Sequence, residues 1–361
     1  LKAVAMERSF VTYVLCDHTK FGKVSAVSFS PVAAACIVCD KCDDEQLKIK
    51  NGSEGGNCLM VYTVTLNPAL DYVMKLKALR TDDINRTDGE EIYYGGKGIN
   101  VSVILTQLGI PNTALGFLGG FTGKKLEEML KNDNVSCDFN YLKNGDTRIN
   151  VKIKADKEID LNACGPEITK EDMQSFLRKL DGIKSGDYLI LAGSIPNTLP
   201  DDIYEQILER VGDRNINCVV DATGDLLKNV LKYKPFLIKP NHHELGDLFS
   251  TQIKSDDDIV KYSKKLQEMG AKNVLVSMAK DGAMLTDENG SVHKIGNAKG
   301  KLINSVGCGD SMVAGFTAGY IKTADYSYAL RLGSACGNAT AFSEKLATRE
   351  EIERVFNAEY K

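Results

Sequence analysis

The stretch SVGCGDS, residues 305–311, places a carboxylate beside a glycine-rich turn at the start of an expected helix. Gly307 and Gly309 allow the backbone to turn tightly, so that successive amide groups can point at an anion. Asp310 then lies next to the expected anion site, where an aspartate can accept a proton from an alcohol that attacks a phosphoryl group. Aspartate is also a common N-cap residue, so the pattern leaves open that Asp310 only caps the helix.

Cys308 lies between the same two glycines. A cysteine nucleophile needs a neighbouring base. The sequence identifies no such base among the four histidines of the chain, which are His18, His242, His243 and His293. We therefore expect Cys308 to be a small packed residue that contributes its backbone, and not its sulfur, to the site.

A second glycine cluster, YYGGKGINVS at 93–102, leads into an amphipathic stretch. Gly95 and Gly96 permit close approach of a ligand, Lys97 supplies a positive charge, and Asn100 follows one turn later. These features favour a site for a phosphorylated sugar. A plain strand-to-helix turn is the alternative.

The segment KPNHHE, residues 239–244, follows an expected strand. Lys239 can face phosphate groups, and Asn241 with Glu244 offers the hard oxygen ligands that hold Mg²⁺ through water. Zinc binding by the two adjacent histidines is disfavoured, because neighbouring residues on a helix do not share a face.

No Walker A loop is present in the sequence. The nearest stretch, GNAKGKL at 296–302, has three residues between its glycines instead of four, and it ends in Leu302 instead of Ser or Thr. Any nucleotide must therefore be held by a different arrangement.

Short apolar runs alternate along the chain with amphipathic stretches. The expected strands are MVYTVTLNPALD (60–71, at its start), YLILAGS (188–194), NCVVDAT (217–223), KPFLIKPN (234–241) and KNVLVSM (272–278). The expected helices include LPDDIYEQILERVG (199–212) and SDDDIVKYSKKLQEMG (255–270), the latter beginning at its acidic residues. This alternation predicts an α/β fold with a mainly parallel sheet covered by helices on both faces, and ligands bind beyond the carboxyl ends of such strands.

Two polar and aromatic segments, 84–94 and 147–155, have no helix pattern of their own and predict a small antiparallel flap.

Composition excludes several classes of partner. The chain has 361 residues, of which 43% are hydrophobic and 26% charged, as in ordinary globular proteins. The net charge of −4 leaves no basic stripe for nucleic acid. No apolar run reaches the roughly 18 residues of a membrane span, and the first residues lack a signal-peptide pattern, so we expect a cytoplasmic protein without a membrane partner.

The first 59 residues form a separate expected unit, an N-terminal extension that ends in the polar linker KIKNGSEGGNC (48–58). Half of the ten cysteines lie here: Cys16, Cys36, Cys39, Cys42 and Cys58. The C-x₂-C-x₂-C spacing, with Cys16 or Cys58 as a fourth ligand, is sufficient for an iron–sulfur or zinc site. We favour a cysteine-rich strand and turn with free thiols, since disulfides are rare in the cytoplasm.

From Met60 to Lys361, about five-sixths of the chain, the sequence resembles the PfkB family of sugar kinases. The resemblance rests on the joint order of TLNPALD (65–71), GGKGIN (95–100), TRINVKI (147–153), GPEI (165–168), AGSIP (192–196), KPNHHE (239–244), VSMAKDGA (276–283) and VGCGDS (306–311). It implies a ribokinase-like three-layer α/β/α fold for residues 60–361, with a small β lid formed near 84–94 and 147–155.

The resemblance also implies residue roles. Asp310 would be the catalytic base, and the amides of Gly307, Cys308 and Gly309 would surround the γ-phosphoryl group of ATP. The implied sugar-phosphate residues are Asp71, Gly95, Gly96, Lys97, Asn100 and Arg148. The implied nucleotide residues are Lys239, Asn241, Ser277, Gly282, Gly309 and Asn338, and Asn241 with Glu244 would serve Mg²⁺. The family's usual alanine is Cys308 here, which would place an oxidisable thiol beside ATP.

Within the family, TLNPALD, TRINVKI and ACGNATAFSE (335–344) are most similar to the branch that phosphorylates fructose 1-phosphate to fructose 1,6-bisphosphate with MgATP. Kinases of tagatose 6-phosphate or fructose 6-phosphate are alternatives, and a sugar-phosphate-responsive regulator or sensor is an alternative of another class. The expected partners are a small phosphosugar and a second copy of the chain, bound through the lid.

Residues 1–50 resemble the C-terminal tail of a DeoR-type transcription regulator, on the stretch VLCDHTKFGKVSAVSFSPV (14–32). The helix-turn-helix is missing, so we expect neither DNA binding nor an independent fold from this tail.

Overall fold

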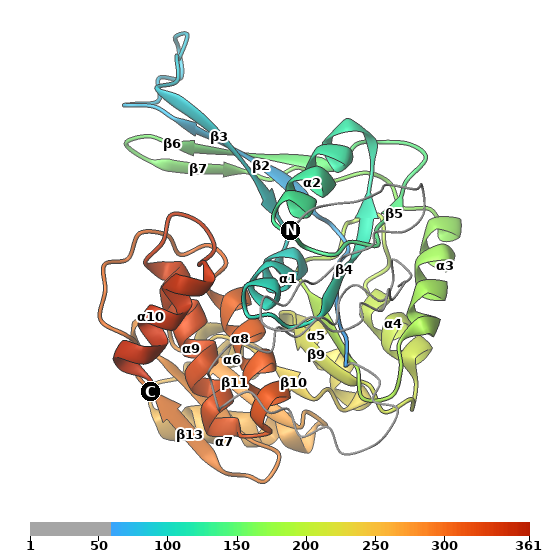
Figure 1. The fold of residues 1–361 in the computed structure, drawn as a ribbon, viewed down its shortest axis with the longest axis vertical. Helices are drawn as coiled ribbons and strands as arrows, with labels where there is room; N and C mark the ends of the chain where they lie inside the picture. The colour runs from blue at the N-terminus through green and yellow to red at the C-terminus, as the bar shows by residue number, and fades with distance from the viewer. Residues whose placement is uncertain (1–58) are drawn as a thin grey trace, which may run out of the picture. The chain divides into compact units, whose positions relative to one another are not determined.

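The computed structural model describes residues 59–361 (Figure 1). The regulator-like tail and the cysteine cluster of Cys36, Cys39 and Cys42 lie outside the described residues. The division of the chain at residues 59 and 60 therefore stays a prediction.

A nine-stranded sheet forms the middle layer, in the order β13-β12-β11-β10-β9-β8-β1-β4-β5. Seven strands are parallel: β1 (Val61–Thr65), β4 (Asn112–Leu118), β5 (Asn140–Tyr141), β8 (Tyr188–Ala192), β9 (Asn217–Asp221), β10 (Leu237–Ile238) and β11 (Asn273–Ser277). Two strands at one edge pair antiparallel: β12 (Ala283–Thr286) and β13 (Val292–Ile295). Every residue of β8 is buried, which explains its continuous apolar run, because helices cover both faces of the sheet.

Helices form the two outer layers. One face carries α1 (Lys97–Gln107), α2 (Gly120–Asn132), α8 (Cys308–Thr323), α9 (Tyr326–Ala341) and α10 (Arg349–Glu359). The other carries α3 (Lys170–Lys179), α4 (Ile203–Val211), α5 (Gly224–Val230), α6 (His242–Leu248) and α7 (Asp256–Glu268). Short 3₁₀ helices are Leu180–Gly182, Leu231–Tyr233 and Ala279–Asp281. The predicted three-layer α/β/α fold is confirmed.

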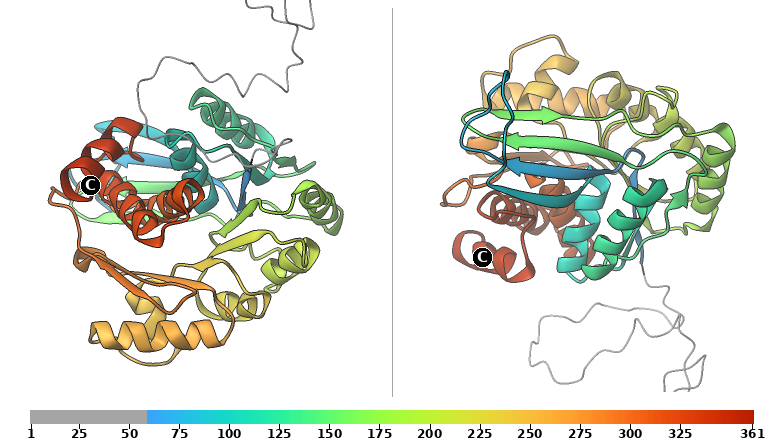
Figure 2. Two further views of the ribbon diagram at one scale, coloured as in Figure 1. Left: turned by 60° about the horizontal axis from the view of Figure 1, so that its bottom comes forward. Right: turned by 90° about the horizontal axis from the view of Figure 1, so that it is seen from above.

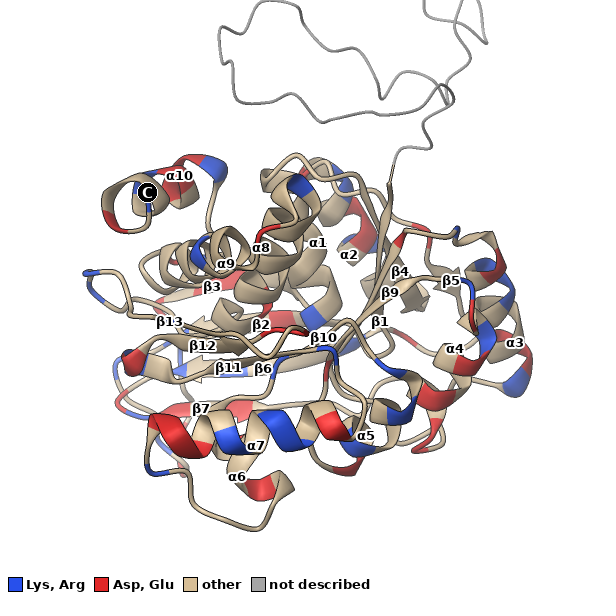
Figure 3. Cartoon of the chain, turned by 90° about the horizontal axis from the view of Figure 1, so that it is seen from below, with Lys and Arg blue, Asp and Glu red and all other residues tan. Residues whose placement is uncertain are grey.

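Local chemistry sets where several helices begin. Thr169, Asn241, Ser255 and Thr348 each form a capping box. The side chain of each accepts a hydrogen bond from the amide three positions later, and the acidic side chain at that position accepts one from the amide of the capping residue. The predicted start of α7 at its acidic residues is confirmed. In contrast to α7, α8 and α9 carry few charges because they are largely buried (Figure 3).

A second, four-stranded sheet projects from the body and is called the lid below (Figures 1 and 2). Its order is β3-β2-β6-β7, with β2 (Ala69–Lys75), β3 (Gly89–Gly95), β6 (Arg148–Lys154) and β7 (Glu158–Leu161). The predicted flap segment 147–155 contains β6, and the segment 84–94 contains all of β3 except its last residue, Gly95. The sequence pattern at 60–71 predicted a first strand at its start and no second one. In the structure, residues 66–68 separate β1 from β2.

Pairing within the lid also differs in part from the prediction. β2 pairs antiparallel with β3, and β6 pairs antiparallel with β7, as expected for a flap. The central pair, β2 with β6, is parallel. This parallel pair is possible because the long chain segment between the two strands passes through the body of the fold.

Among the described residues, no helix is long and apolar enough to cross a membrane.

Candidate active site

Asp310 lies in the first turn of α8, where its side chain reaches α1. Its Oδ2 accepts a hydrogen bond of 2.8 Å from Nδ2 of Asn100, and the residue is only 6% exposed. Gly307 is the N-cap, with φ of 80°, and no side chain caps this helix. The alternative that Asp310 only caps α8 is therefore wrong, and its carboxylate is directed toward a neighbouring helix.

The environment of Asp310 changes its acidity. Burial and the nearby carboxylate of Asp221 raise the pKa of Asp310 to about 6, against the opposing effects of Asn100, Lys97 and Lys239. A carboxylate with a pKa near the working pH is better suited to accept a proton than an ordinary exposed aspartate. The position fits a general base.

Two lysines and the carboxylate of Asp221 lie near Asp310. Nζ of Lys97 and Nζ of Lys239 are each 3.5 Å from Oδ1 of Asp221. Burial lowers the pKa of Lys97, but the carboxylates of Asp221, Asp310 and Glu244 outweigh it, so this pKa is above its ordinary value. Lys97 thus stays charged, and the structure brings together two cations that the sequence predicted separately.

Asp221 is a site residue that the sequence analysis missed. It ends β9 and is 2% exposed, at the carboxyl edge of the sheet. The available signal was an aspartate closing the apolar run NCVVDAT. That run was interpreted only as a strand.

The α8 N-terminus begins at the glycine turn that the sequence predicts, with Gly307 in the left-handed region. A side chain at Gly307 would bring Cβ within 2.6 Å of Leu346 Cδ2, in addition to the strain of its positive φ. A Cβ at Gly309 would lie 3.2 Å from Lys239 Nζ. The backbone of this turn therefore lies against a lysine side chain, with the free amides of the helix start nearby.

Cys308 begins α8 between these glycines. Its thiol donates to the carbonyl of Asn304 over 3.4 Å, and burial, with the charge of Asp310, raises the thiol pKa to about 11. A thiol with a raised pKa is a poor nucleophile and is slow to oxidise. These features support a packed residue and disfavour the expected sensitivity to oxidation.

The second glycine cluster is both a strand-to-helix turn and a neighbour of Asp310. Gly96 is the N-cap of α1 with φ of 136°, and a Cβ there would meet Thr65 Cγ2 at 2.6 Å. The hydroxyl of Thr65 accepts a hydrogen bond from Ile99 N. This packing fixes the start of α1 and so places Lys97 and Asn100.

Asp71 lies on β2 of the lid, beside the end of β3. A Cβ on Gly95 would be 3.0 Å from Asp71 Oδ1, so a larger residue would displace the carboxylate. Asn150 donates to Asp71 Oδ1 over 2.9 Å, and Lys152 Nζ is 3.8 Å from Oδ2. Asn150 and Lys152 were missed, although they alternate with Arg148 within TRINVKI and so share its face of β6.

Arg148 binds backbone carbonyls. Its Nη2 donates to Asn67 O over 3.0 Å and its Nη1 to Ala163 O over 3.1 Å. Its Nε is buried and has no hydrogen-bond partner within residues 59–361. The guanidinium therefore ties the loop before GPEI to the segment after β1, and retains N–H groups for an anion.

The KPNHHE segment starts α6. Asn241 Oδ1 accepts hydrogen bonds of 2.9 Å from His243 N and Glu244 N, and Glu244 Oε2 accepts one of 2.8 Å from Asn241 N. The amide oxygen of Asn241 is thus occupied, while Glu244 keeps a second carboxylate oxygen. The remaining oxygen of Glu244 fits a hydrated Mg²⁺ bound through water. Asn241 orients this carboxylate through its backbone amide. No group of three metal-ligating side chains occurs in the described part of the chain.

The predicted nucleotide residues lie in two places. Ser277, at the end of β11, forms an isolated parallel β-bridge with Asn241. Gly282 has a φ of 91°, and a Cβ there would collide with the carbonyl oxygen of Ile295. Asn338, on α9, donates to Ser334 O and to Tyr360 Oη over 2.8 and 3.0 Å. The structure thus joins Ser277 to the α6 start, whereas the amide of Asn338 is bound within the C-terminal helices.

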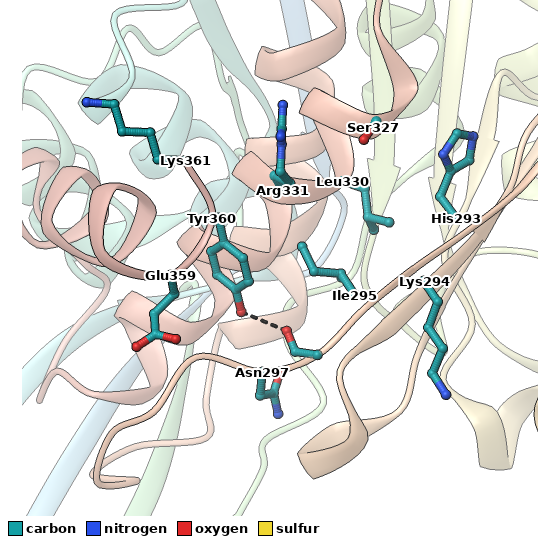
Figure 4. A pocket seen from close by; sticks show the side chains of 11 residues that line it. His293, Lys294, Ile295, Asn297, Ser327, Leu330, Arg331, Glu359, Tyr360 and Lys361 are labelled. Atoms are coloured by element: carbon teal, nitrogen blue, oxygen red, sulfur yellow. Dashed lines mark hydrogen bonds between the residues drawn. The ribbon is translucent and has the colours of Figure 1, made fainter.

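A cavity of about 490 Å³ lies between β13, α9 and the end of α10, lined in part by His293, Lys294, Arg331 and Lys361 (Figure 4). These basic side chains point in different directions in Figure 4. The cavity contains none of the predicted site residues, and we assign no function to it.

The family model described as pfkB family carbohydrate kinase matches residues 64–352. The chain belongs to this family. The 1-phosphofructokinase of Bacillus subtilis is 47% identical to this pfkB kinase over 296 residues, which are 82% of this chain and 97% of the relative. The D-tagatose-1-phosphate kinase of Bacillus licheniformis is 37% identical with the same coverage. A crystal structure of Escherichia coli phosphofructokinase-2 with substrates and products matches with a TM-score of 0.79 and 26% identity, covering 84% of this chain and all of that one.

Family membership makes the chain an ATP-dependent carbohydrate kinase and confirms the resemblance seen in the sequence. The arrangement around Asp310 suits that chemistry. A buried carboxylate, two lysines and a helix N-terminus converge beyond the carboxyl ends of β9 and β10. This arrangement suits phosphoryl transfer, which depends on positioning and electrostatic stabilisation.

Proposed function

We propose that this pfkB kinase transfers the γ-phosphoryl group of ATP to the C6 hydroxyl of fructose 1-phosphate, giving fructose 1,6-bisphosphate and ADP. The observation that carries the proposal is the buried Asp310, held by Asn100 and flanked by Lys97 and Lys239. The 47% identity to the Bacillus subtilis 1-phosphofructokinase supports the choice of sugar.

In this reaction Asp310 accepts the proton of the C6 hydroxyl. The hydroxyl oxygen forms a bond to the γ-phosphorus while the bond to the β,γ-bridging oxygen breaks, and ADP leaves with those electrons. The amides of Gly307, Cys308 and Gly309 stabilise the transferred charge, together with Lys97 and Lys239. The protein supplies orientation and charge, and it forms no covalent intermediate.

The sugar phosphate would bind between the lid and α1. Asp71 accepts hydrogen bonds from sugar hydroxyls, and Gly95 and Gly96 allow the ligand to approach the backbone. Asn100 contacts the sugar beside the base. The free N–H groups of Arg148 bind the 1-phosphate, which a planar guanidinium suits.

ATP would lie across the carboxyl ends of β10 and β11. Lys239 and Asn241 would face its phosphates, and Ser277 and Gly282 would form the wall of the pocket. Glu244 would hold Mg²⁺ through water, with Asn241 orienting its carboxylate. The metal, when bound, neutralises charge on the β- and γ-phosphates.

Tagatose 1-phosphate is a second candidate, because a D-tagatose-1-phosphate kinase is 37% identical over most of the chain. This sugar differs from fructose 1-phosphate in the configuration at C4. The two candidates share the same 1-phosphate and the same C6 acceptor, so one site suits both.

A coupled assay of ADP formation tests the proposal. Purified protein is assayed with fructose 1-phosphate, tagatose 1-phosphate, fructose 6-phosphate and tagatose 6-phosphate. We expect the highest kcat/KM for fructose 1-phosphate. A higher kcat/KM for either 6-phosphate overturns the assignment, and absence of turnover with all four favours the sensor alternative.

We also propose that two copies associate in the cytoplasm through their lids. In the lid sheet, Ile92, Tyr72, Val151 and Leu161 pair across neighbouring strands and therefore share one face, opposite the face of Asp71. Ile92 is 43% exposed and Leu161 56%. An exposed apolar face on a projecting sheet supports an interface between two copies.

Sedimentation equilibrium tests the dimer. We expect the wild-type protein to be dimeric and the double variant Ile92→Lys/Leu161→Lys to be monomeric with an unchanged melting temperature. A monomeric wild-type protein overturns the proposal.

A further inference from the structure

Asp221 occupies a central position between the elements of the site. It ends β9, and it lies between Lys97 at the start of α1 and Lys239 after β10. Both lysines reach the same oxygen, Oδ1. Asp221 is therefore a bridge between two cations from segments more than a hundred residues apart in the sequence.

The second oxygen of Asp221 is unusual. Oδ2 is buried and has no hydrogen-bond partner in the part of the chain that the structure describes. A buried carboxylate oxygen without a partner costs free energy, so a residue with only a packing role would be expected to be replaced by an apolar or neutral one. Packing alone therefore does not account for a carboxylate at this position.

Lys239 is more deeply buried than Lys97. Its side chain is 7% exposed, compared with 40% for Lys97, and Asp221 is its only ion-pair partner among residues 59–361. The position of a Cβ on Gly309 would be 3.2 Å from Lys239 Nζ. Asp221 therefore controls the place of a cation that lies against the anion-binding turn.

We propose that Asp221 is a positioning residue of phosphoryl transfer, whose carboxylate holds Lys97 and Lys239 together beside the base Asp310. The inference rests on the proposed kinase reaction. Asp221 need not touch either substrate; it acts through the two lysines and through its charge.

The charge of Asp221 also acts on Asp310. The groups that face Asp310 are Lys97 and Asn100 from α1, Lys239 from the segment after β10, Asp221 from β9, and the thiol of Cys308 on its own helix. Of these, Asp221 is the only carboxylate that raises the pKa of Asp310. Removal of this negative charge leaves the two lysines to stabilise the ionised form of Asp310, so the base becomes weaker.

The test compares Asp221→Asn with the wild-type protein, using the best acceptor of the four sugar phosphates. We expect kcat to fall roughly 10²-fold, because the cations lose their fixed position. We also expect the acid limb of the pH profile of kcat/KM to move to lower pH, because this limb reports the ionisation of the base in the free enzyme. A kcat within twofold of wild type, or an acid limb that does not move, overturns the proposal.

A matched control separates this effect from a loss of structure. Asp187 is also a buried aspartate, 5% exposed, but it binds backbone amides of Met60 and Lys184 far from Asp310 in the fold. We expect Asp187→Asn to lower the melting temperature without moving the acid limb. If Asp221→Asn does not fold, Asp221→Ser removes the same charge with a smaller side chain. The proposal then requires that Asp221→Ser moves the acid limb of the kcat/KM profile to lower pH.

A double-mutant cycle with Lys97→Met tests whether Asp221 acts through that lysine. We expect the loss in the double variant to be smaller than the product of the two single losses. Independent, multiplicative losses contradict the proposal. The wild-type assay is a separate readout: absence of turnover there refutes the kinase reaction itself, whereas normal turnover with an unaffected Asp221→Asn refutes only the role of Asp221.

Discussion

Asn100 donates a hydrogen bond of 2.8 Å to the carboxylate of Asp310, although 210 positions separate the two residues in the sequence. The bond joins the first turns of α1 and α8, the two helix starts that follow the glycine clusters. It therefore connects the expected sugar site on α1 with the expected phosphoryl site on α8.

The ionisation of Asp310 predicts the pH dependence of catalysis. The pKa of Asp310 is raised to about 6, chiefly by burial and then by Asp221, and only the ionised carboxylate can accept a proton. We expect kcat/KM to fall as the pH drops below about 6. Steady-state rates from pH 5 to 9 measure this limb, and a kcat/KM that stays constant down to pH 5 would contradict the assignment.

The same shift predicts a stability effect with a defined sign. A carboxyl whose pKa is raised by folding favours the folded state when protonated, and this contribution is lost as the pH rises through about 6. Asp310→Asn imitates the protonated form. We expect this variant to be more stable than wild type at pH 7.5. Its gain in the free energy of unfolding over wild type should be larger at pH 7.5 than at pH 4.5, by on the order of 1–3 kcal/mol. Urea unfolding at both pH values measures it; an equal difference at the two would refute the buried charge.

Gly307→Ala tests the anion-binding turn. Its φ of 80° and the 2.6 Å approach to Leu346 make any Cβ unfavourable, so we expect a loss of about 1–2 kcal/mol in stability and at least a tenfold loss in kcat. Gly290→Ala is the matched control, because Gly290 has the same φ of 80° but no atom within 4 Å of the added Cβ. The control should lose stability and keep its kcat. Equal loss of kcat in both variants would show that backbone strain alone is responsible.

Arg148→Lys tests recognition of the sugar phosphate. Lysine cannot keep two backbone hydrogen bonds and also face a phosphate, so we expect the KM of the sugar phosphate to rise roughly tenfold or more while the KM of ATP stays the same. Arg214 offers a control, since its guanidinium also binds backbone carbonyls, those of Val211 and Leu180 among them. Arg214→Lys should change the stability of the protein but leave the KM of the sugar phosphate and the KM of ATP unchanged. Parallel changes in the two KM values for Arg148→Lys would argue against a sugar-specific role.

Local patterns predicted the parts of the site that depend on local chemistry. The glycines at 307 and 309, the adjacent aspartate and the following helix are encoded within one short segment, and the structure confirms that turn. The central strands were also predictable, because burial on both faces requires continuous apolar runs such as YLILA. The capping residue Ser255 marked the start of α7 for the same local reason.

Other features depend on contacts that no local pattern contains. Asp221 gains its role only because β9, α1 and the segment after β10 meet at one edge of the sheet. Asn150 is noticeable only when β6 pairs with β2 and places it against Asp71. Asn338 had a predicted ligand role, but a tertiary contact with Tyr360 engages its amide.

The proposed reaction requires that Asp310 deprotonates the C6 hydroxyl of fructose 1-phosphate. The most direct measurement is the steady-state rate of ADP formation with fructose 1-phosphate for the wild-type protein and for Asp310→Asn at pH 8. We expect turnover by the wild type and a kcat lower by about 10²–10⁴ in the variant, with little change in the KM of either substrate. A variant with a kcat near that of wild type would contradict this role of Asp310.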